Sequence, residues 1–328
     1  GMELEEDPHT RACLEAYFKN NIYREIPENN WKMVTVPHGS IVLDNPNGMA
    51  PGLIMEKNGK TAILLPGPPN ELYPLFEGQV FPYLEKRQNS QLVSHMVKIC
   101  GYGESQVEDK ILDLIDKQTN PTIATYAKTA EVQVRLTAKA VTKEEGEALI
   151  APVMAELFNR FGDCIFTTEE DVTLEMAVVD LLQKKHLTMA TAESCTGGMI
   201  AARLVNVSGV SDVFMQGMVT YSNEAKVRLL GVKEETLKAH GAVSRETALE
   251  MALGGAERAQ TDVCVAVTGL AGPGGGSKEK PVGFVYMACA VKGKAEVLEY
   301  HFKGNRGKIR EQSMMKALDL VRRCVLKA

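Results

Sequence analysis

The sequence predicts an α/β protein whose last part, residues 171–328, is a layered α/β/α domain. Two observations carry this prediction. Apolar strand-like runs alternate with helical patterns throughout that part, and glycine-rich turns follow several of the runs. The pattern changes twice upstream, which predicts two further domains at residues 1–88 and 89–170. A chain of 328 residues is long enough for roughly two to three domains.

Residues 1–88 are dense in proline, asparagine and glycine, which mark specified turns. The elements expected between these turns are a helix at Asp7–Asn20, strands at Gly52–Glu56 and Thr61–Leu65, and a helix at Asn70–Gln79. The loop Leu65–Glu71 opens onto the last helix with Asn70 near its cap, a geometry that suits a phosphate or a carboxylate. A purely structural turn explains the loop equally well.

Residues 89–170 follow a β-α-β-β-α-β order, typical of a small α+β module. The expected strands are Ser94–Cys100, Thr122–Ala127, Glu131–Ala138 and Cys164–Phe166, and the expected helices are Glu104–Lys117 and Lys143–Phe161. Neither a G-x-x-G loop between helices nor a set of stacking aromatic residues is present, so the pattern favours a structural connector over a nucleic-acid-binding module.

Residues 171–328 begin with a helical stripe of apolar residues at Thr173–Lys185. The strands expected after it are Leu187–Ala192, Gly217–Tyr221, Asp262–Thr268, Gly283–Val291 and Ala295–Phe302. The expected helices are Gly197–Val207, Asn223–Leu230, Lys233–Ala239, a helix from the cap Ser244 to Ala259, and Lys308–Val325. This alternation predicts helices on both faces of one sheet.

The charge, the apolar runs, and the cysteine and histidine patterns of the chain argue against several classes of function. The net charge of −5 argues against a protein that binds nucleic acid over much of its surface. No apolar run approaches the ~20 residues of a membrane helix, and no signal peptide is apparent, so we expect a cytoplasmic protein. The seven cysteines include no C-x-x-C and read as mostly buried thiols. The six histidines show no pair at ligand spacing, so we expect no metal site and no cofactor.

The string T-A-E-S-C-T-G-G, Thr191–Gly198, places reactive side chains where a strand ends and a helix starts. With Thr196 as the expected N-cap, free amides beyond it point back toward Ser194 and suit an oxyanion or a phosphate. A capped helix without chemistry is the alternative.

A second string, V-T-Y-S-N-E-A-K, places Lys226 in the first turn of a helix capped by Ser222. The helix dipole and burial would both lower the pKa of a lysine there, and a neutral amine can take a proton from a serine. Exposure of Lys226 to water is the alternative.

Two further strings supply polar groups. Glycines in Val267–Ser277 permit close approach of the backbone at the end of an apolar strand. In Lys303–Arg310, Arg306 could hold a phosphate, although a solvated basic face is equally compatible. Together the four strings predict a nucleotide-sized polar site but do not choose its reaction.

At these residues the chain resembles the CinA family. The matching strings are T-A-E-S-C-T-G-G, V-T-Y-S-N-E-A-K, G-A-V-S (Gly241–Ser244), T-G-L-A-G-P-G-G-G-S-K-E-K-P-V-G (Thr268–Gly283) and G-N-R (Gly304–Arg306). The resemblance implies an amidohydrolase domain over residues 171–328 that converts nicotinamide mononucleotide and water to nicotinate mononucleotide and ammonia. It implies a Ser/Lys dyad, here Ser194 and Lys226, and a homodimer.

The resemblance also implies roles for other residues. Those implied for the oxyanion or for support of the dyad are Thr196, Gly197, Gly198 and Tyr221, and those implied for substrate binding are Ser211, Thr268, Gly269, Gly272 and Arg306. Cys195 beside the serine is an alternative nucleophile.

Residues 1–88 resemble the family's molybdopterin-binding-like domain through P-E-N-N, N-P-N-G-M-A-P-G and L-P-G-P-P-N-E, but lack roughly its first half. The family's ADP-ribose pyrophosphatase activity is therefore expected to be absent or impaired. Residues 89–170 correspond to a KH-like connector. Two alternatives stay open: a pterin- or nucleotide-binding protein without turnover, and a nucleic-acid adaptor linked to competence or repair.

Overall fold

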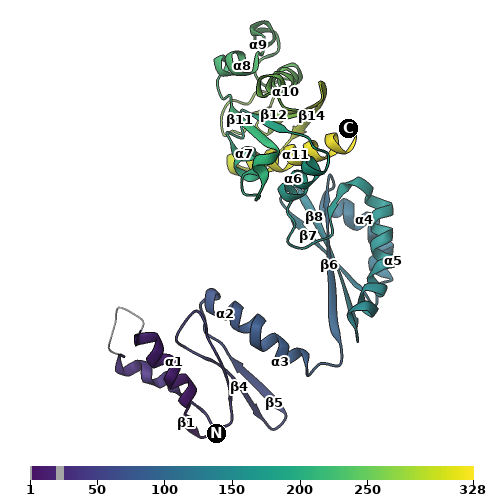
Figure 1. Ribbon diagram of the computed structural model, residues 1–328. Coiled ribbons are helices and arrows are strands. Elements are labelled where there is room, and N and C mark those ends of the chain that lie inside the picture. The colour runs from purple at the N-terminus through teal and green to yellow at the C-terminus, as the bar shows by residue number, and fades with distance from the viewer. Residues whose placement is uncertain (1, 20–25) are drawn as a thin grey trace. The chain divides into compact units, whose positions relative to one another are not determined.

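The computed structural model describes residues 2–19 and 26–328. Internal contacts divide the chain into two compact units, Gly1–Gln91 and Leu92–Ala328 (Figure 1). The first boundary lies close to the predicted one between residues 88 and 89. The second predicted boundary, between residues 170 and 171, falls inside the larger unit.

The first unit contains two small antiparallel sheets. Its strands are β1 (Leu4–Glu6) paired with β2 (Thr35–Pro37), and β3 (Ile41–Leu43), β4 (Gly52–Lys57) and β5 (Lys60–Leu64). Its helical segments are α1 (Pro8–Lys19), η1 (Glu28–Val34), α2 (Pro69–Leu75), the π-turn η2 (Phe76–Val80) and α3 (Phe81–Glu85). The expected end of the first helix at Asn20 lies outside the described residues. The single helix expected at Asn70–Gln79 starts one residue earlier and continues through the π-turn, which follows Pro74.

The second unit begins with the expected α+β module. It comprises β6 (Gln91–Cys100), α4 (Glu104–Asp116), β7 (Thr122–Lys128), β8 (Glu131–Ala140), α5 (Lys143–Phe161) and β9 (Ile165–Thr167). The sheet order is β7-β8-β6-β9, and α4 and α5 cover one face (Figure 1). Alternate residues of β8 are buried under these helices. The β-α-β-β-α-β order predicted from the sequence is confirmed.

The rest of the unit is a five-stranded sheet between two helical layers. The strands are β10 (Met189–Glu193), β11 (Phe214–Val219), β12 (Val263–Gly269), β13 (Phe284–Val291) and β14 (Lys294–His301). The helices are α6 (Leu174–Lys184), α7 (Met199–Leu204), α8 (Asn223–Leu230), α9 (Glu234–His240), α10 (Arg245–Ala259) and α11 (Arg306–Leu326). In the order β11-β10-β12-β13-β14, the first three strands are parallel to one another. Strand β13 is antiparallel to β12, and β14 is antiparallel to β13.

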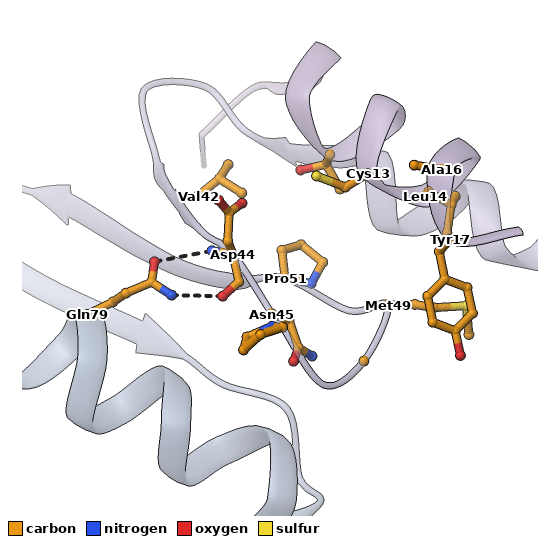
Figure 2. Close-up of a pocket in the computed structure, with 13 residues that line it drawn as sticks. Cys13, Leu14, Ala16, Tyr17, Val42, Asp44, Asn45, Met49, Pro51 and Gln79 are labelled. Atoms are coloured by element: carbon orange, nitrogen blue, oxygen red, sulfur yellow. Dashed lines mark hydrogen bonds between the residues drawn. The ribbon is translucent and has the colours of Figure 1, made fainter. Parts of the chain in front are cut away.

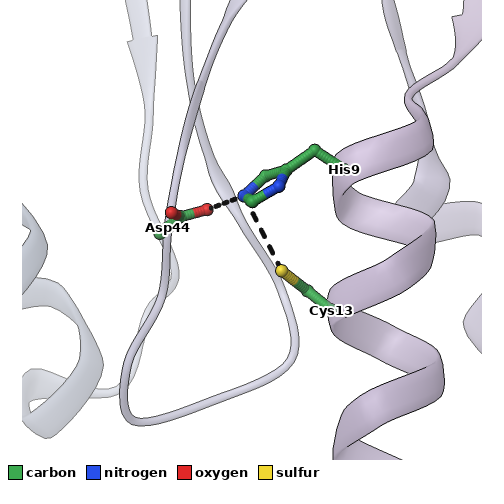
Figure 3. A group of neighbouring side chains, drawn as sticks. All are labelled: His9, Cys13 and Asp44. Atoms are coloured by element: carbon green, nitrogen blue, oxygen red, sulfur yellow. Dashed lines mark hydrogen bonds and ion pairs between the residues drawn. The ribbon is translucent and has the colours of Figure 1, made fainter.

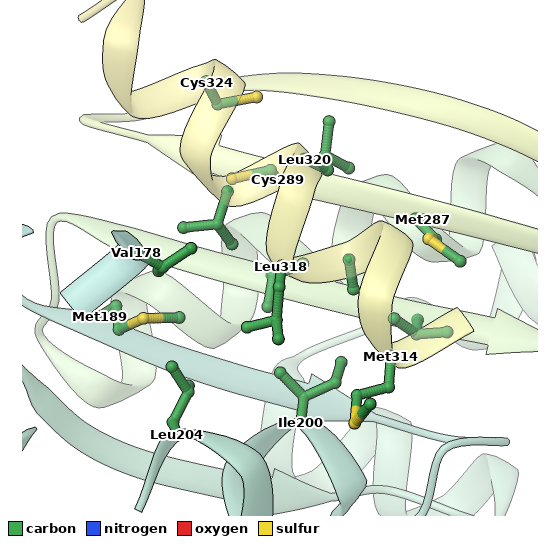
Figure 4. Close-up of a cluster of buried hydrophobic side chains, with 14 of the residues drawn as sticks. Val178, Met189, Ile200, Leu204, Met287, Cys289, Met314, Leu318, Leu320 and Cys324 are labelled. Atoms are coloured by element: carbon green, nitrogen blue, oxygen red, sulfur yellow. The ribbon is translucent and has the colours of Figure 1, made fainter. Parts of the chain in front are cut away.

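The central strand β12 is buried on both faces, and its side chains alternate between two cores. Val263, Val265 and Val267 face α6, α7 and α11, where Leu318 lies in the middle of the cluster (Figure 4). Cys264 and Ala266 face α10 in a core made mostly of small residues. A Cβ on Gly255 of α10 would lie 2.6 Å from the Cys264 sulfur, so small residues set this close approach. The predicted α/β/α layering is confirmed.

Polar contacts join the α+β module to the layered domain. The buried Lys98 ammonium donates to the carbonyls of Glu170 and Val172 at 2.6 and 2.8 Å, and Arg322 of α11 donates to the carbonyl of Asp163 at 2.5 Å. These bonds join the segment on both sides of residue 170 to β6 and α11, which is consistent with one compact unit for the two parts. Among the described residues, no helix is both long and apolar enough to cross a membrane.

Because Leu318 is fully buried in the larger core, we expect Leu318→Ala to lower the free energy of unfolding by about 2–5 kcal/mol through lost burial and a residual cavity. Urea denaturation followed by circular dichroism measures this change. The control is Leu326→Ala on the same helix, since Leu326 is 38% exposed and should cost about 1 kcal/mol or less. Equal losses in the two variants would contradict the assigned core.

Candidate active site

Ser194 lies at the carboxyl edge of the parallel strands, directly after β10. Its amide donates to the carbonyl of Val267 on β12 at 3.0 Å, and the amide of Thr220 donates to the carbonyl of Glu193 at 2.8 Å. The chain at Ser194 is therefore fixed between its two neighbours in the sheet. Ligands of open α/β sheets bind at this edge.

The structure brings Lys226 to Ser194, although 32 residues separate them in the sequence. Helix α8 starts after its cap Ser222, whose side chain accepts from the amide of Ala225, and Lys226 lies in the first turn as predicted. The Lys226 Nζ and Ser194 Oγ atoms are 3.1 Å apart. The serine hydroxyl and the lysine amine are thus within hydrogen-bonding distance, which a serine nucleophile and its general base would require.

The Lys226 amine is buried without a carboxylate partner. Its side chain is 1% exposed, and it takes part in no ion pair among the described residues. It donates to the carbonyl of Thr220 at 2.9 Å and to that of Tyr221 at 3.4 Å. Burial lowers the pKa of Lys226 because desolvation penalises its charged form, and the surrounding charges oppose this only in part. A neutral amine can give its two hydrogens to these carbonyls and direct its lone pair at the Ser194 hydroxyl.

The carboxylate of Glu193 caps α7. Glu193 is fully buried, and its oxygens accept from the amides of Gly198, Ile200 and Ala201 at 3.0, 3.1 and 2.9 Å. A negative charge at a helix start is stabilised by the free amides and by the helix dipole. This carboxylate therefore fixes the strand-to-helix turn that carries Ser194.

The start of α7 differs from the prediction. Thr196 is not its N-cap, because Gly197 and Gly198 both adopt left-handed conformations with φ of +60° and +92°, and the helix begins only at Met199. The glycine amides are not free for an oxyanion either. That of Gly197 donates to the carbonyl of Ser194, and that of Gly198 donates to Glu193.

Thr196 keeps polar groups without protein partners. Its amide donates to no acceptor among the hydrogen bonds of the described residues, and its buried hydroxyl has no partner there. The buried hydroxyl of Thr220 is likewise unpaired within that part of the chain. Buried polar groups are usually hydrogen-bonded, so these two hydroxyls are exceptions among the fully buried groups of the site. Of the three residues expected at the oxyanion, Thr196 is the one whose amide has no acceptor among the described residues.

Arg310 of α11 holds the outer side of the same turn. Its guanidinium donates to the carbonyls of Cys195 and Thr196 at 3.0 and 2.7 Å. The sequence pattern included Arg310 only in a basic stretch, and it assigned no role to Glu193. The sequence signal for a carboxylate that caps the next helix is a charged residue at the end of a mostly apolar strand, as Glu193 is in T-A-E-S.

Arg306 connects two other predicted site residues. It donates to the carbonyl of Gly272 at 2.8 Å and to the hydroxyl of Tyr221 at 2.9 Å. Tyr221 is 61% exposed, and its carbonyl is one of the acceptors for Lys226. The exposed Arg306 thus joins the glycine loop to the segment before α8.

Thr268 and Gly269 lie at the same sheet edge but have structural tasks. The Thr268 hydroxyl donates to the carbonyl of Ala242 at 2.7 Å. A Cβ on Gly269 would lie 2.6 Å from Val285, so this glycine allows β12 and β13 to pack.

The structure does not bring Ser211 to this site within the chain. Ser211 is exposed in the turn Val210–Asp212 before β11, at the amino edge of the sheet. The six residues of β11 separate the two edges by about 20 Å.

Cys195 is the adjacent alternative nucleophile. It is 5% exposed, and burial raises the pKa of its thiol to about 11. Since the thiolate is the reactive form, this environment disfavours Cys195. The cysteine burial expected from the sequence holds for most of the thiols, but Cys13 is exposed.

Comparison with known proteins shows the family. Residues 171–325 match the family described as CinA C-terminal domain, and residues 94–167 match the damage-inducible protein CinA KH domain. A relative in Clostridium beijerinckii, described as a competence-damage inducible protein, is 50% identical over 327 residues, which are 99% of this chain and 79% of that protein. This chain belongs to the CinA family. A CinA-like protein of Kosmotoga olearia is 50% identical over 317 residues, 97% of this chain and 76% of that protein.

Solved structures of the CinA superfamily are also similar. The competence/damage inducible protein CihA of Agrobacterium tumefaciens is 45% identical, with 45% of this chain and 90% of that chain covered and a TM-score of 0.44. A CinA superfamily protein of Klebsiella pneumoniae is 34% identical, with 47% and 97% covered and a TM-score of 0.46.

Loss of the Glu193 charge should loosen the start of α7. Glu193→Gln keeps the shape but offers a single acceptor oxygen, and each buried amide left unpaired costs about 1–3 kcal/mol. We expect the free energy of unfolding to fall by about that amount in urea denaturation. Glu257→Gln, which neutralises an exposed carboxylate of α10, is the control and should change little. Unchanged stability in Glu193→Gln would show that the carboxylate does not hold the turn.

Proposed function

We propose that this CinA-family protein is a serine amidohydrolase that removes the carboxamide of nicotinamide mononucleotide. The observation that carries the proposal is the 3.1 Å contact between the Ser194 hydroxyl and the buried amine of Lys226, which forms no ion pair among the described residues. A lysine made less basic by burial can act as a general base for serine. The substrate is taken from the family resemblance, because the contact itself fits any small amide or ester.

In the proposed first step, Lys226 takes the proton of Ser194 while the serine oxygen attacks the carboxamide carbon. The carbonyls of Thr220 and Tyr221 hold the resulting ammonium in place. We assign the amide of Thr196, which has no acceptor among the described residues, as the donor to the negative oxygen of the tetrahedral intermediate. The turn that carries Ser194 and Thr196 is held by Glu193 and Arg310, so these two residues need little rearrangement during the reaction.

Collapse of the intermediate breaks the bond from carbon to nitrogen. Lys226 returns the proton to the departing amine, which leaves as ammonia and makes the base neutral again. Water then attacks the acyl-serine with Lys226 as base, and nicotinate mononucleotide is released. The remaining donor capacity of the exposed Arg306 suits the substrate phosphate.

The decisive measurement is ammonia release from nicotinamide mononucleotide by the wild type, Ser194→Ala and Lys226→Ala, without added metal. We expect turnover by the wild type and a loss of at least ~10³-fold in both variants, the size expected for a catalytic group. Cys195→Ala serves as the matched control and should retain most activity. Full activity in Ser194→Ala would contradict the proposal and favour another nucleophile such as Cys195. No turnover by a folded wild type would also contradict it and favour a nucleotide-binding protein.

The pH dependence tests the state of the base. Only neutral Lys226 can accept the serine proton, so activity should rise as pH passes upward through its pKa. Because burial lowers that pKa, the midpoint of the rise in kcat/KM should lie below the ordinary lysine value of about 10.4. Product formation followed by chromatography avoids coupling enzymes that have pH limits of their own. The control Lys238→Ala, on an exposed lysine of α9, should leave the midpoint unchanged. A kcat/KM that does not change with pH below about 10.4 would exclude Lys226 as the base.

A further inference from the structure

Three potential metal ligands lie together in the first unit, outside the site described above. They are the exposed side chains of His9, Cys13 and Asp44 (Figure 3). The His9 Nε2 atom is 2.7 Å from an Asp44 carboxylate oxygen and 3.7 Å from the Cys13 sulfur. One ligand atom from each of the three residues lies within 4.8 Å of the other two.

Two independent elements position these side chains. His9 and Cys13 are four residues apart on α1, so they project from the same face of the helix (Figure 3). Asp44 directly follows β3, and the side chain of Gln79 fixes its backbone by two hydrogen bonds, accepting from the Asp44 amide at 3.2 Å and donating to the Asp44 carbonyl at 2.7 Å (Figure 2). The third ligand is therefore held from a separate part of the fold.

Two of the three distances between ligand atoms can be compared with those of a tetrahedral site. Ordinary zinc bond lengths place a nitrogen and a sulfur ligand about 3.6 Å apart and a nitrogen and an oxygen ligand about 3.4 Å apart. The observed distance from nitrogen to sulfur is 3.7 Å and already matches. The observed 2.7 Å from nitrogen to oxygen reflects a direct hydrogen bond, which would widen by less than about 1 Å as a metal replaced the shared proton.

We propose that His9, Cys13 and Asp44 form a three-ligand site for a borderline transition-metal ion such as Zn²⁺ or Co²⁺. Imidazole and thiolate favour such ions over Mg²⁺ and Ca²⁺, which prefer oxygen ligands. Binding requires the Cys13 thiolate and releases its proton. The three ligands belong to the first compact unit, whereas Ser194 and Lys226 belong to the second.

The fourth coordination position has room for a water or for an oxygen ligand. An open pocket of about 800 Å³ adjoins the ligands, and Cys13 and Asp44 are part of its lining (Figure 2). The lining also includes the polar side chains of Asn45 and Gln79 and the apolar side chains of Leu14 and Met49. Three protein ligands with an open position facing a pocket are the arrangement of catalytic rather than purely structural zinc sites.

The test titrates the full chain with Co²⁺ and records its absorption spectrum. We expect one Co²⁺ per chain, with a charge-transfer band from thiolate to cobalt and the visible bands of a tetrahedral ion, and we expect Zn²⁺ to remove these bands by displacement. Cys13→Ser should abolish the charge-transfer band, and His9→Ala should weaken binding at least ~10-fold. Gln79→Ala should also weaken binding by roughly 10-fold, since groups that orient ligands contribute on that scale.

The matched control is His38→Ala. His38 is an exposed histidine of the same unit and pairs with Glu5 at 2.8 Å, but it does not belong to the three-ligand group. This variant should bind Co²⁺ like the wild type. Thermal unfolding of each variant without metal checks that the fold is intact. The proposal is overturned if the wild type shows no charge-transfer band at saturating Co²⁺, or if the band persists in Cys13→Ser.

Discussion

The buried carboxylate of Glu193 is the interaction on which the candidate active site depends. The carboxylate accepts from three backbone amides, those of the N-cap Gly198 and of Ile200 and Ala201 in α7. These bonds fix where the chain leaves β10 and where the helix begins. Ser194 lies between these two fixed points. Arg310 closes the turn from the opposite side through the carbonyls of Cys195 and Thr196. The reactive serine is thus held by charged groups that need not touch a substrate.

Charge is distributed unequally around the dyad. The Glu193 carboxylate accepts from three backbone amides, whereas the polar partners of the Lys226 amine among the described residues are two carbonyls and a hydroxyl. A carboxylate beside Lys226 would favour its charged form and raise its pKa, which would remove its capacity as a base at moderate pH. The first turn of a helix also disfavours a positive charge. Burial and position therefore act in the same direction on this amine.

Much of the layered domain could be predicted because its strands are apolar runs and its helices carry caps such as Ser222 and Ser244. Local sequence patterns do not show which residues distant in the sequence come into contact. The pairing of Ser194 with Lys226 therefore rested on family resemblance. The predicted start of α7 at Gly197 was wrong, because Gly197 and Gly198 adopt left-handed conformations and the helix begins only after them. Ser211 was grouped with the site by matching strings, but parallel strands place it at the other edge of the sheet.

The ligand group of His9, Cys13 and Asp44 escaped the sequence for a related reason. A search for paired histidines or closely spaced cysteines does not find a histidine and a cysteine one helical turn apart. The third ligand lies 35 residues from His9 and becomes a neighbour only when β3 and α1 are folded together. Groups of mixed ligand types are found by the distances between side-chain atoms in the structure, and not by the spacing of residues along the sequence.

The two cores around β12 differ in the size of their side chains, and this has an evolutionary consequence. On the α11 side, valine, leucine and methionine can exchange for one another with small loss, because volume is easily conserved among large flexible residues. On the α10 side most core residues are alanine, and Gly255 approaches Cys264 closely, so fewer residues there can shrink to compensate for an added methyl group. Descendants of this sequence are therefore expected to diverge more rapidly on one side of the sheet than on the other.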